Sequence, residues 1–172
     1  YSRMHYVSWD RADKDNLKLL AEAGPEVLGV FQPDRASVNG EIWDLVVSPE
    51  SGAIATRGGD EIVRAHDPLR RGDRVRVDVE GRQYLMVGES SRNWIIDDAD
   101  GNKVAQFTRD QSGVRKAILE FEGETHLPLT DIAGLAWLSR SLTEARQVQS
   151  ANVLIATLTL MSAVALAVWF LM

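Results

Sequence analysis

The sequence predicts a mainly β protein, an antiparallel barrel or sandwich of about nine strands, with one transmembrane helix at its C-terminal end. Three observations predict this. Residues after 26 alternate apolar and polar side chains in short runs, as strands with one buried and one solvated face do. Turn-forming residues separate these runs at regular intervals. The final twenty residues, 153–172, carry no charge. We expect an N-terminal segment (1–26), a β domain (27–122), an amphipathic helix (129–149) and a transmembrane helix (151–172).

The N-terminal segment predicts a short helix. In the run DKDNLKLLAEAGP, residues 13–25, the apolar side chains of Leu17, Leu20 and Ala21 fall on one helical face. Gly24 and Pro25 then provide a stop signal.

The β domain is predicted from residues that alternate with a period of two. Val75, Val77 and Val79 point one way, whereas the charged residues between them point the other way. The predicted strands are 27–31, 41–47, 53–56, 61–65, 73–80, 83–88, 93–97, 103–109 and 114–122.

The stretch WIIDDADGNKVAQF, residues 94–107, raises the choice between a calcium loop and a hairpin turn. An EF-hand loop needs an oxygen ligand five positions before its glycine and a glutamate six positions after it. Counted from Gly101, these positions hold Ile96 and Phe107, neither of which binds a cation. Asp, Gly and Asn between two alternating runs are typical of a turn. We therefore predict a β-hairpin.

The same hairpin resembles a known family. Its pattern W-x-I-x-D-x-x-G-x-x-V-A-x-x-x-R is similar to the tubby C-terminal-like superfamily, which includes the phospholipid scramblases and the plant LURP-one-related proteins. The resemblance covers residues 73–122. It implies a twelve-stranded barrel threaded by an apolar C-terminal helix. The residues that carry it are Trp94, Ile96, Asp98, Gly101, Val104, Ala105 and Arg109.

Two helices are predicted after the strands. In residues 129–149, Ile132, Leu135, Leu138 and Leu142 recur at steps of three and four, which favours an amphipathic helix. Residues 153–172 are apolar on all sides and reach about 30 Å as a helix, the thickness of the hydrocarbon core of a bilayer. The sequence leaves open whether helix 129–149 plugs the β domain or continues into the membrane span.

The membrane helix has an orientation signal and a packing face. All 19 Lys and Arg residues precede it, which favours a cytoplasmic N-terminal domain. Residues that are small or weakly polar form a stripe along one side, where another membrane helix could approach closely. The stripe comprises Asn152, Ala156, Thr159, Ala163 and Ala167.

One basic concentration surrounds the turn DPLRRGDR. Its arginines are candidates for contact with lipid headgroups or with an acidic partner. The alternative is a solvated turn that Asp67, Asp73 and Asp78 partly neutralise. The arginines are Arg64, Arg70, Arg71, Arg74 and Arg76.

Composition and motifs argue against catalysis. A net charge of −6 does not favour nucleic-acid binding, and the absence of cysteine removes disulfides and thiolate chemistry. His5, His66 and His126 lack metal-ligand spacing, and no nucleophile or phosphate-binding motif occurs. We expect no enzyme, cofactor, metal or small-molecule substrate. A hydrolase built around His66 is the least favoured alternative.

The sequence thus favours a single-pass membrane protein without catalytic activity. We expect an accessory or assembly subunit of a larger membrane complex, such as a respiratory or transport complex, whose partners are lipids and other integral membrane subunits. The alternative is a scramblase-like lipid-binding barrel that acts at anionic membrane surfaces.

Overall fold

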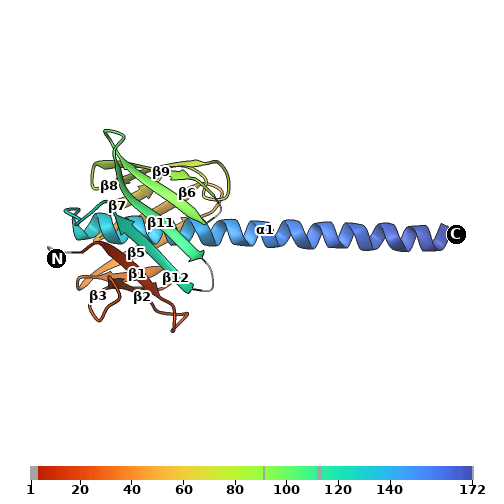
Figure 1. The fold of residues 1–172 in the computed structure, drawn as a ribbon, viewed down its shortest axis with the longest axis horizontal. Helices are drawn as coiled ribbons and strands as arrows, with labels where there is room; N and C mark the ends of the chain where they lie inside the picture. Colours follow the sequence, from red (N-terminus) through yellow and green to blue (C-terminus); the bar gives the residue numbers. More distant parts are fainter. Residues whose placement is uncertain (1–3, 91, 112–113, 172) are drawn as a thin grey trace.

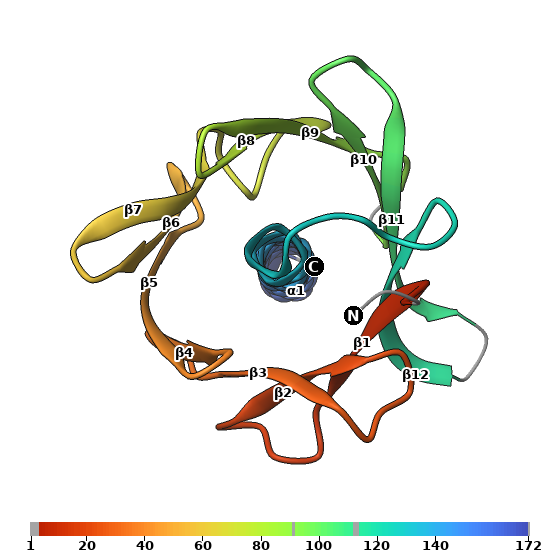
Figure 2. The ribbon, with the colours of Figure 1, turned by 90° about the vertical axis from the view of Figure 1, so that its left-hand side faces the viewer.

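A closed antiparallel barrel of twelve strands surrounds one long helix (Figure 1 and Figure 2). The structure, a computed structural model, describes residues 4–90, 92–111 and 114–171. The helix, α1, is Leu129–Leu171. The strands are β1 (Tyr6–Asp10), β2 (Leu17–Ala21), β3 (Val27–Phe31), β4 (Arg35–Val38), β5 (Glu41–Ser48), β6 (Gly52–Arg57), β7 (Asp60–Ala65), β8 (Arg74–Val79), β9 (Arg82–Gly88), β10 (Asn93–Asp98), β11 (Lys103–Gln111) and β12 (Val114–Phe121).

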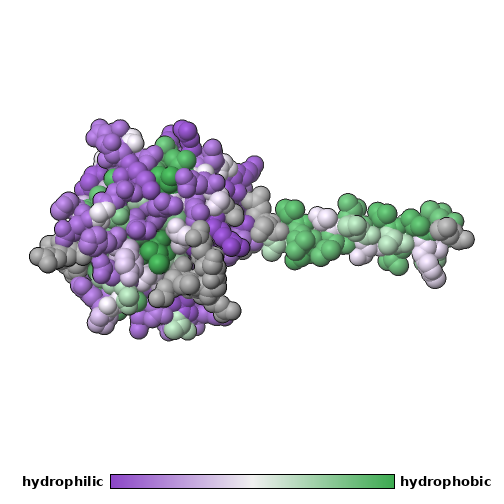
Figure 3. Space-filling model, viewed as in Figure 1, coloured by the Kyte–Doolittle hydropathy of each residue, from purple (hydrophilic) through white to green (hydrophobic). Residues whose placement is uncertain are grey.

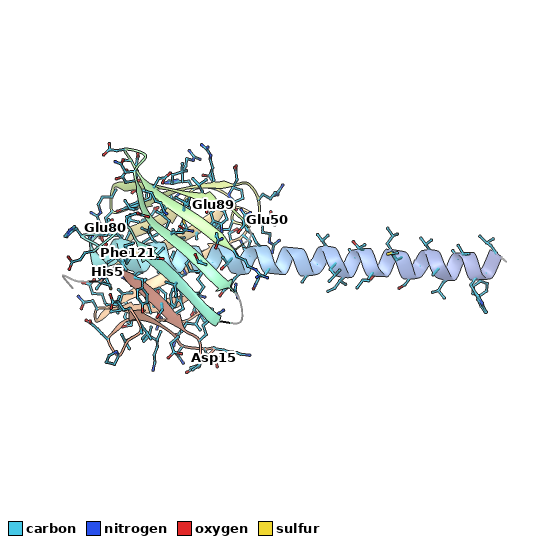
Figure 4. All side chains as sticks on the ribbon, in the orientation of Figure 1. His5, Asp15, Glu50, Glu80, Glu89 and Phe121 are labelled. Atoms are coloured by element: carbon cyan, nitrogen blue, oxygen red, sulfur yellow. The ribbon has the colours of Figure 1, made fainter. Side chains whose placement is uncertain are left out.

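The strands follow one another around the wall in chain order. Each pairs with the next, and β1 closes the barrel against β12, with Ser8 opposite Ile118. Because consecutive strands are antiparallel, connections after odd-numbered strands lie at one end and those after even-numbered strands at the other. We call the end from which α1 emerges the exit end, and the opposite one the far end. Glu50 lies at the exit end, whereas His5 and Glu80 lie at the far end (Figure 4).

The N-terminal helix predicted for residues 13–25 is wrong, because residues 17–21 form strand β2. In LKLLA, Leu20 interrupts the alternation of a strand and gives a helix-like spacing, and the structure has a register shift between Leu19 and Leu20. All nine predicted strands are present, but β1, β2 and β4 were not predicted. The barrel therefore also takes in residues from the N-terminal segment.

The hairpin prediction is confirmed. Strands β10 and β11 pair antiparallel around a turn in which Gly101 has φ +82°. The carboxylate of Asp98 accepts the backbone N–H groups of Asp100 at 3.0 Å and Asn102 at 2.9 Å, which fixes the turn.

The two predicted C-terminal helices are one continuous helix of 43 residues, about 65 Å long. Its first part plugs the barrel and its second part projects from the exit end (Figure 1). The helix that plugs the barrel therefore also continues into the apolar segment that the sequence predicts to span a membrane. The prediction that the first part is amphipathic is wrong, since residues 131–139 are buried on every side.

The hydrophobic core is the layer between the barrel wall and the helix. Inward-facing side chains of every strand meet those of α1, so that helix residues fill the lumen. Two buried hydroxyl groups of the plug are satisfied within the helix. The hydroxyl of Ser139 donates to the carbonyl of Leu135 at 2.7 Å, and that of Thr143 donates to the carbonyl of Arg140 at 2.9 Å.

Candidate functional site

The most conspicuous surface is the projecting half of α1. Residues 151–171 are exposed around the whole circumference, and the helix is long and apolar enough to cross a membrane. The contrast with the mostly hydrophilic barrel surface is visible in Figure 3. The hydroxyls of this segment donate to carbonyls four residues earlier, so that none of the three is left as an unsatisfied donor on the apolar surface. These hydroxyl groups belong to Thr157, Thr159 and Ser162.

The predicted stripe of small residues lies on one side of this exposed helix. At 100° per residue, its five members fall within a sector of about 80°. Ala165 lies on the opposite side, although it is just as small. The stripe runs from Asn152 to Ala167, and all of its side chains are exposed.

Two arginines of α1 hold the helix at the exit end of the barrel. The guanidinium of Arg140 lies 4.8 Å from the ring centroid of Trp9 and pairs with Glu144 at 2.9 Å. Arg146 lies 4.6 Å from the ring centroid of Trp94 and donates to the carbonyl of Gly72. Burial lowers the pKa of Arg146 from its ordinary value. Cation–π contacts therefore join the plug to the wall where the helix leaves it.

A buried ion pair holds the other end of the plug. The carboxylate of Asp131, which is fully buried, accepts hydrogen bonds from Arg82 Nη2 at 2.5 Å, Arg82 Nε at 2.7 Å and the Tyr84 hydroxyl at 2.5 Å. Burial and the bond to Asp131 raise the pKa of Tyr84, and the bond to Asp131 raises that of Arg82. The three groups fix how deep α1 sits in the barrel.

Sequence reasoning missed this ion pair. Asp131 is the one acidic residue between positions 125 and 143, which is a signal that its carboxylate needs a buried partner. Its partners, Arg82 and Tyr84, precede it by 49 and 47 residues. Periodicity within a segment does not reveal contacts across such distances.

The predicted arginine group does not form one patch. Arg64 pairs with Glu61, and Arg76 pairs with Asp67 at 2.9 Å. Arg70 and Arg71 share Glu50, at 2.7 Å and 3.0 Å. Arg74 is exposed at the start of β8. Hydrogen bonds from Arg71 and Arg70 lower the pKa of Glu50, and one from Arg76 lowers that of Asp67.

The three histidines lie apart from one another. His5 is 3.4 Å from a carboxylate oxygen of Glu22, whereas His66 follows strand β7 and His126 precedes α1. Within residues 4–90, 92–111 and 114–171, no three His, Asp or Glu side chains are grouped so as to bind a metal ion.

Comparison of the chain with models of protein families, with curated proteins and with solved structures gave no match.

Proposed function

We propose that this chain is a non-catalytic single-pass membrane protein that serves as an accessory or assembly subunit of a larger membrane complex. One observation carries the proposal: the helix that plugs the barrel continues as an apolar rod, exposed on all sides. Water does not tolerate such a surface, but the hydrocarbon core of a bilayer does. The small-residue stripe then faces lipid or another membrane helix.

The charges of the loops support a cytoplasmic barrel. The connections at the exit end carry five Lys or Arg residues, and those at the far end carry none. Basic residues in short loops next to a span favour the cytoplasmic side. The five are Arg11, Lys14, Arg70, Arg71 and Arg92.

The proposal includes membership of the tubby C-terminal-like superfamily. A twelve-stranded barrel with a helix along its axis supports this resemblance, since both features were implied by it. The comparisons gave no independent support.

The packing stripe provides the test. Replacing Ala163 by Leu fills the space into which a neighbouring helix would fit, and Ala165→Leu adds the same bulk on the opposite side. We expect Ala163→Leu to release the protein from its host complex, whereas Ala165→Leu leaves it bound. Native-gel sizing with mass spectrometry, after extraction from native membranes in mild detergent, measures the association.

Two outcomes contradict the proposal. The unaltered protein would migrate alone, without stoichiometric partners, if it were not a subunit. If the host complex retained both variants equally, the stripe would not be part of the interface.

A second function, lipid binding, is favoured by one cleft at the exit end. This cleft, about 280 Å³, is lined by Arg70, Arg140, Trp137, Val47 and Pro49, next to the point where α1 leaves the barrel. Glu144 also lines the cleft and pairs with Arg140, and Arg70 pairs with Glu50. A phospholipid phosphate would therefore bind by displacing these carboxylates beside the apolar side chains. Short-chain phosphatidic acid added to the full chain in neutral detergent should shift the amide resonance of Arg70 in a salt-sensitive way, and phosphatidylcholine should not. No shift at low salt would reject lipid binding.

A further inference from the structure

A second cleft lies on the outer wall of the barrel, over strands β8, β9 and β10. Its volume is about 550 Å³, within the range of sites that bind ligands. Arg76, Leu85 and Asp97 stand side by side across the three strands, because Leu85 is the register partner of both others. Asp78 and Gln83 extend the cleft toward the far end.

The guanidinium group of Arg76, which carries positive charge in this cleft, is paired with Asp67. Two nitrogens of Arg76 donate to the carboxylate of Asp67, Nη2 at 2.9 Å and Nε at 3.0 Å. The backbone N–H of Arg76 donates to the same carboxylate at 2.8 Å. This bidentate pair fixes the guanidinium, so that Arg76 does not neutralise the other carboxylates.

In the described part of the chain, three partly buried carboxylates of the cleft have no cation bound: Asp78, Asp97 and Asp98, the last of which accepts backbone N–H groups of the β10–β11 turn. Among the residues that the structure describes, Asp97 has no hydrogen-bond or ion-pair partner, and Asp78 accepts only the backbone N–H of Gly81, at 2.9 Å. Lys103, opposite Asp97 on β11, pairs with Glu122 at 3.0 Å. The cleft therefore keeps an excess of negative charge.

Apolar side chains continue from the cleft toward the exit end. Leu85 lines the cleft, and Val87 and Ile95 are register partners on the same outer face of β9 and β10. All three are partly buried. An apolar centre beside charged groups is the arrangement that protein interfaces show.

We propose that this outer cleft docks a segment of a partner protein that carries an arginine or lysine next to apolar residues. The cationic head lies between Asp78 and Asp97, and the apolar residues cover Leu85, Val87 and Ile95. The inference rests on the proposed function, because the host complex supplies the segment. An anionic lipid headgroup does not fit, since its phosphate would face uncompensated carboxylates. The cleft also opens sideways, parallel to the proposed membrane plane, where a neighbouring subunit would stand.

A peptide titration tests the chemistry directly. The probe is acetyl-Arg-Ile-Leu-amide, added to the ¹⁵N-labelled full chain in detergent micelles, and its control carries citrulline, the neutral isostere, in place of arginine. We expect chemical-shift changes confined to residues 76–87 and 95–101, and about tenfold weaker binding of the citrulline peptide. Comparable affinity of the two peptides, or changes elsewhere on the barrel, would overturn the proposal.

Two variants that replace aspartate by asparagine test whether the carboxylates of the cleft are the ones that bind the peptide. The double variant Asp78→Asn/Asp97→Asn keeps the size of both side chains but replaces one acceptor oxygen of each by an NH2 donor, and should weaken the binding of the arginine peptide about tenfold or more. Asp60→Asn, at the far-end start of β7, removes an exposed carboxylate outside the cleft and should leave the affinity unchanged. Equal weakening by Asp60→Asn would show only a general charge effect.

Extraction from native membranes separates this inference from the proposed function. If the unaltered protein carries stoichiometric partners and the double variant loses them, both stand. If the double variant keeps its partners, the cleft is not the docking site, although the proposed function remains. If the unaltered protein migrates alone, both the proposed function and the proposal that the cleft docks a partner subunit are rejected. If the unaltered protein self-associates and the double variant does not, the cleft binds a second copy of this chain, and the proposal of a different partner protein is rejected.

Discussion

At the scale of single residues, the carboxylate of Asp131 is the most constrained group in the barrel. It lies fully buried in the first turn of α1 and accepts hydrogen bonds from Arg82 and Tyr84 of β9. A buried charge that loses its partner costs more than the intact pair contributes. The pair therefore specifies one depth of the plug among those that its apolar side chains alone would allow.

Arg82→Gln should be strongly destabilising. It leaves the fully buried carboxylate of Asp131 without its counter-ion, and we expect the free energy of unfolding to fall by about 3 kcal/mol. Tyr84→Phe removes one hydrogen bond and should cost about 1.5 kcal/mol. Denaturant unfolding of the full chain in mild detergent, followed by tryptophan fluorescence, measures both. Glu61→Gln, which breaks the exposed pair with Arg64, is the control and should change little.

The surface pair of Asp67 and Arg76 should give a stability that depends on pH. The hydrogen bond from Arg76 lowers the pKa of Asp67 in the folded protein, so the unfolded state binds the proton more readily. The contribution is then complete above about pH 5 and is lost as the pH falls below about 4. The difference in unfolding free energy between the unaltered protein and Asp67→Asn should shrink over this range. A difference that stays constant down to pH 2.5 would contradict the shift.

At the scale of elements, the contact between α1 and β7 sets how closely the helix approaches the wall. A Cβ added to Gly134 would lie 2.8 Å from Cγ2 of Val63, which is fully buried. Glycine is here because the wall leaves no space for a side chain, despite its low helix propensity.

Gly134→Ala should therefore destabilise the protein. The steric cost exceeds the gain in helix propensity, and we expect a net loss of about 1 to 2 kcal/mol in the free energy of unfolding. Val63→Ala provides the space, so the alanine at 134 should cost less in that background than in the unaltered protein. Urea unfolding of the two single variants and the double variant measures this coupling. Additive effects would mean that the two side chains do not meet.

The elements that the sequence predicts correctly are those with clean alternation. Strand β8 places valine at every second position on the buried face, and its bounds agree within a residue or two with the prediction. Strand β4, with the sequence RASV, has four residues and only two apolar ones, too few for periodicity to show. In β2 the apolar Leu20, which lies at the register shift, interrupts the alternation and gives the sequence a helix-like spacing.

At the scale of the whole molecule, the tryptophans inside the barrel are buried, whereas the one on the projecting half of α1 is exposed. Trp169 is 75% exposed near the end of the rod. The other four are buried, at Trp9, Trp43, Trp94 and Trp137.

Lipids brominated in their acyl chains should quench the emission of Trp169 alone in reconstituted vesicles. The buried four lie within the barrel, out of reach of the bromine atoms. We therefore expect Trp169→Phe to abolish the quenching. Shallow bromine positions should quench more than deep ones, because aromatic side chains favour the membrane interface. Quenching that persists in the variant would place the barrel itself in lipid.

How much of the candidate site the sequence predicts depends on the range of the interactions. The apolar rod and its stripe are local properties of residues 151–172, so reading the chain suffices for them. The outer cleft is not local, since Asp78, Leu85 and Asp97 meet only through the pairing of three strands. The pairing of Arg70 and Arg71 with Glu50 is equally invisible, because it joins two connections some twenty residues apart.

Because α1 runs through the inside of a closed barrel, the order in which the barrel and the helix assemble is restricted. If the outer half of α1 is held in a bilayer, as we propose, a finished barrel cannot slip over the helix from that side. The wall has to wrap around the helix, and its seam is the pairing of β1 with β12, where Ser8 meets Ile118. That step joins residues 110 positions apart and carries the largest loop-closure entropy of any strand pair here. We therefore expect seam closure to be the slow step of folding, and a chain arrested before it to expose two unpaired edges, which are sites for aggregation.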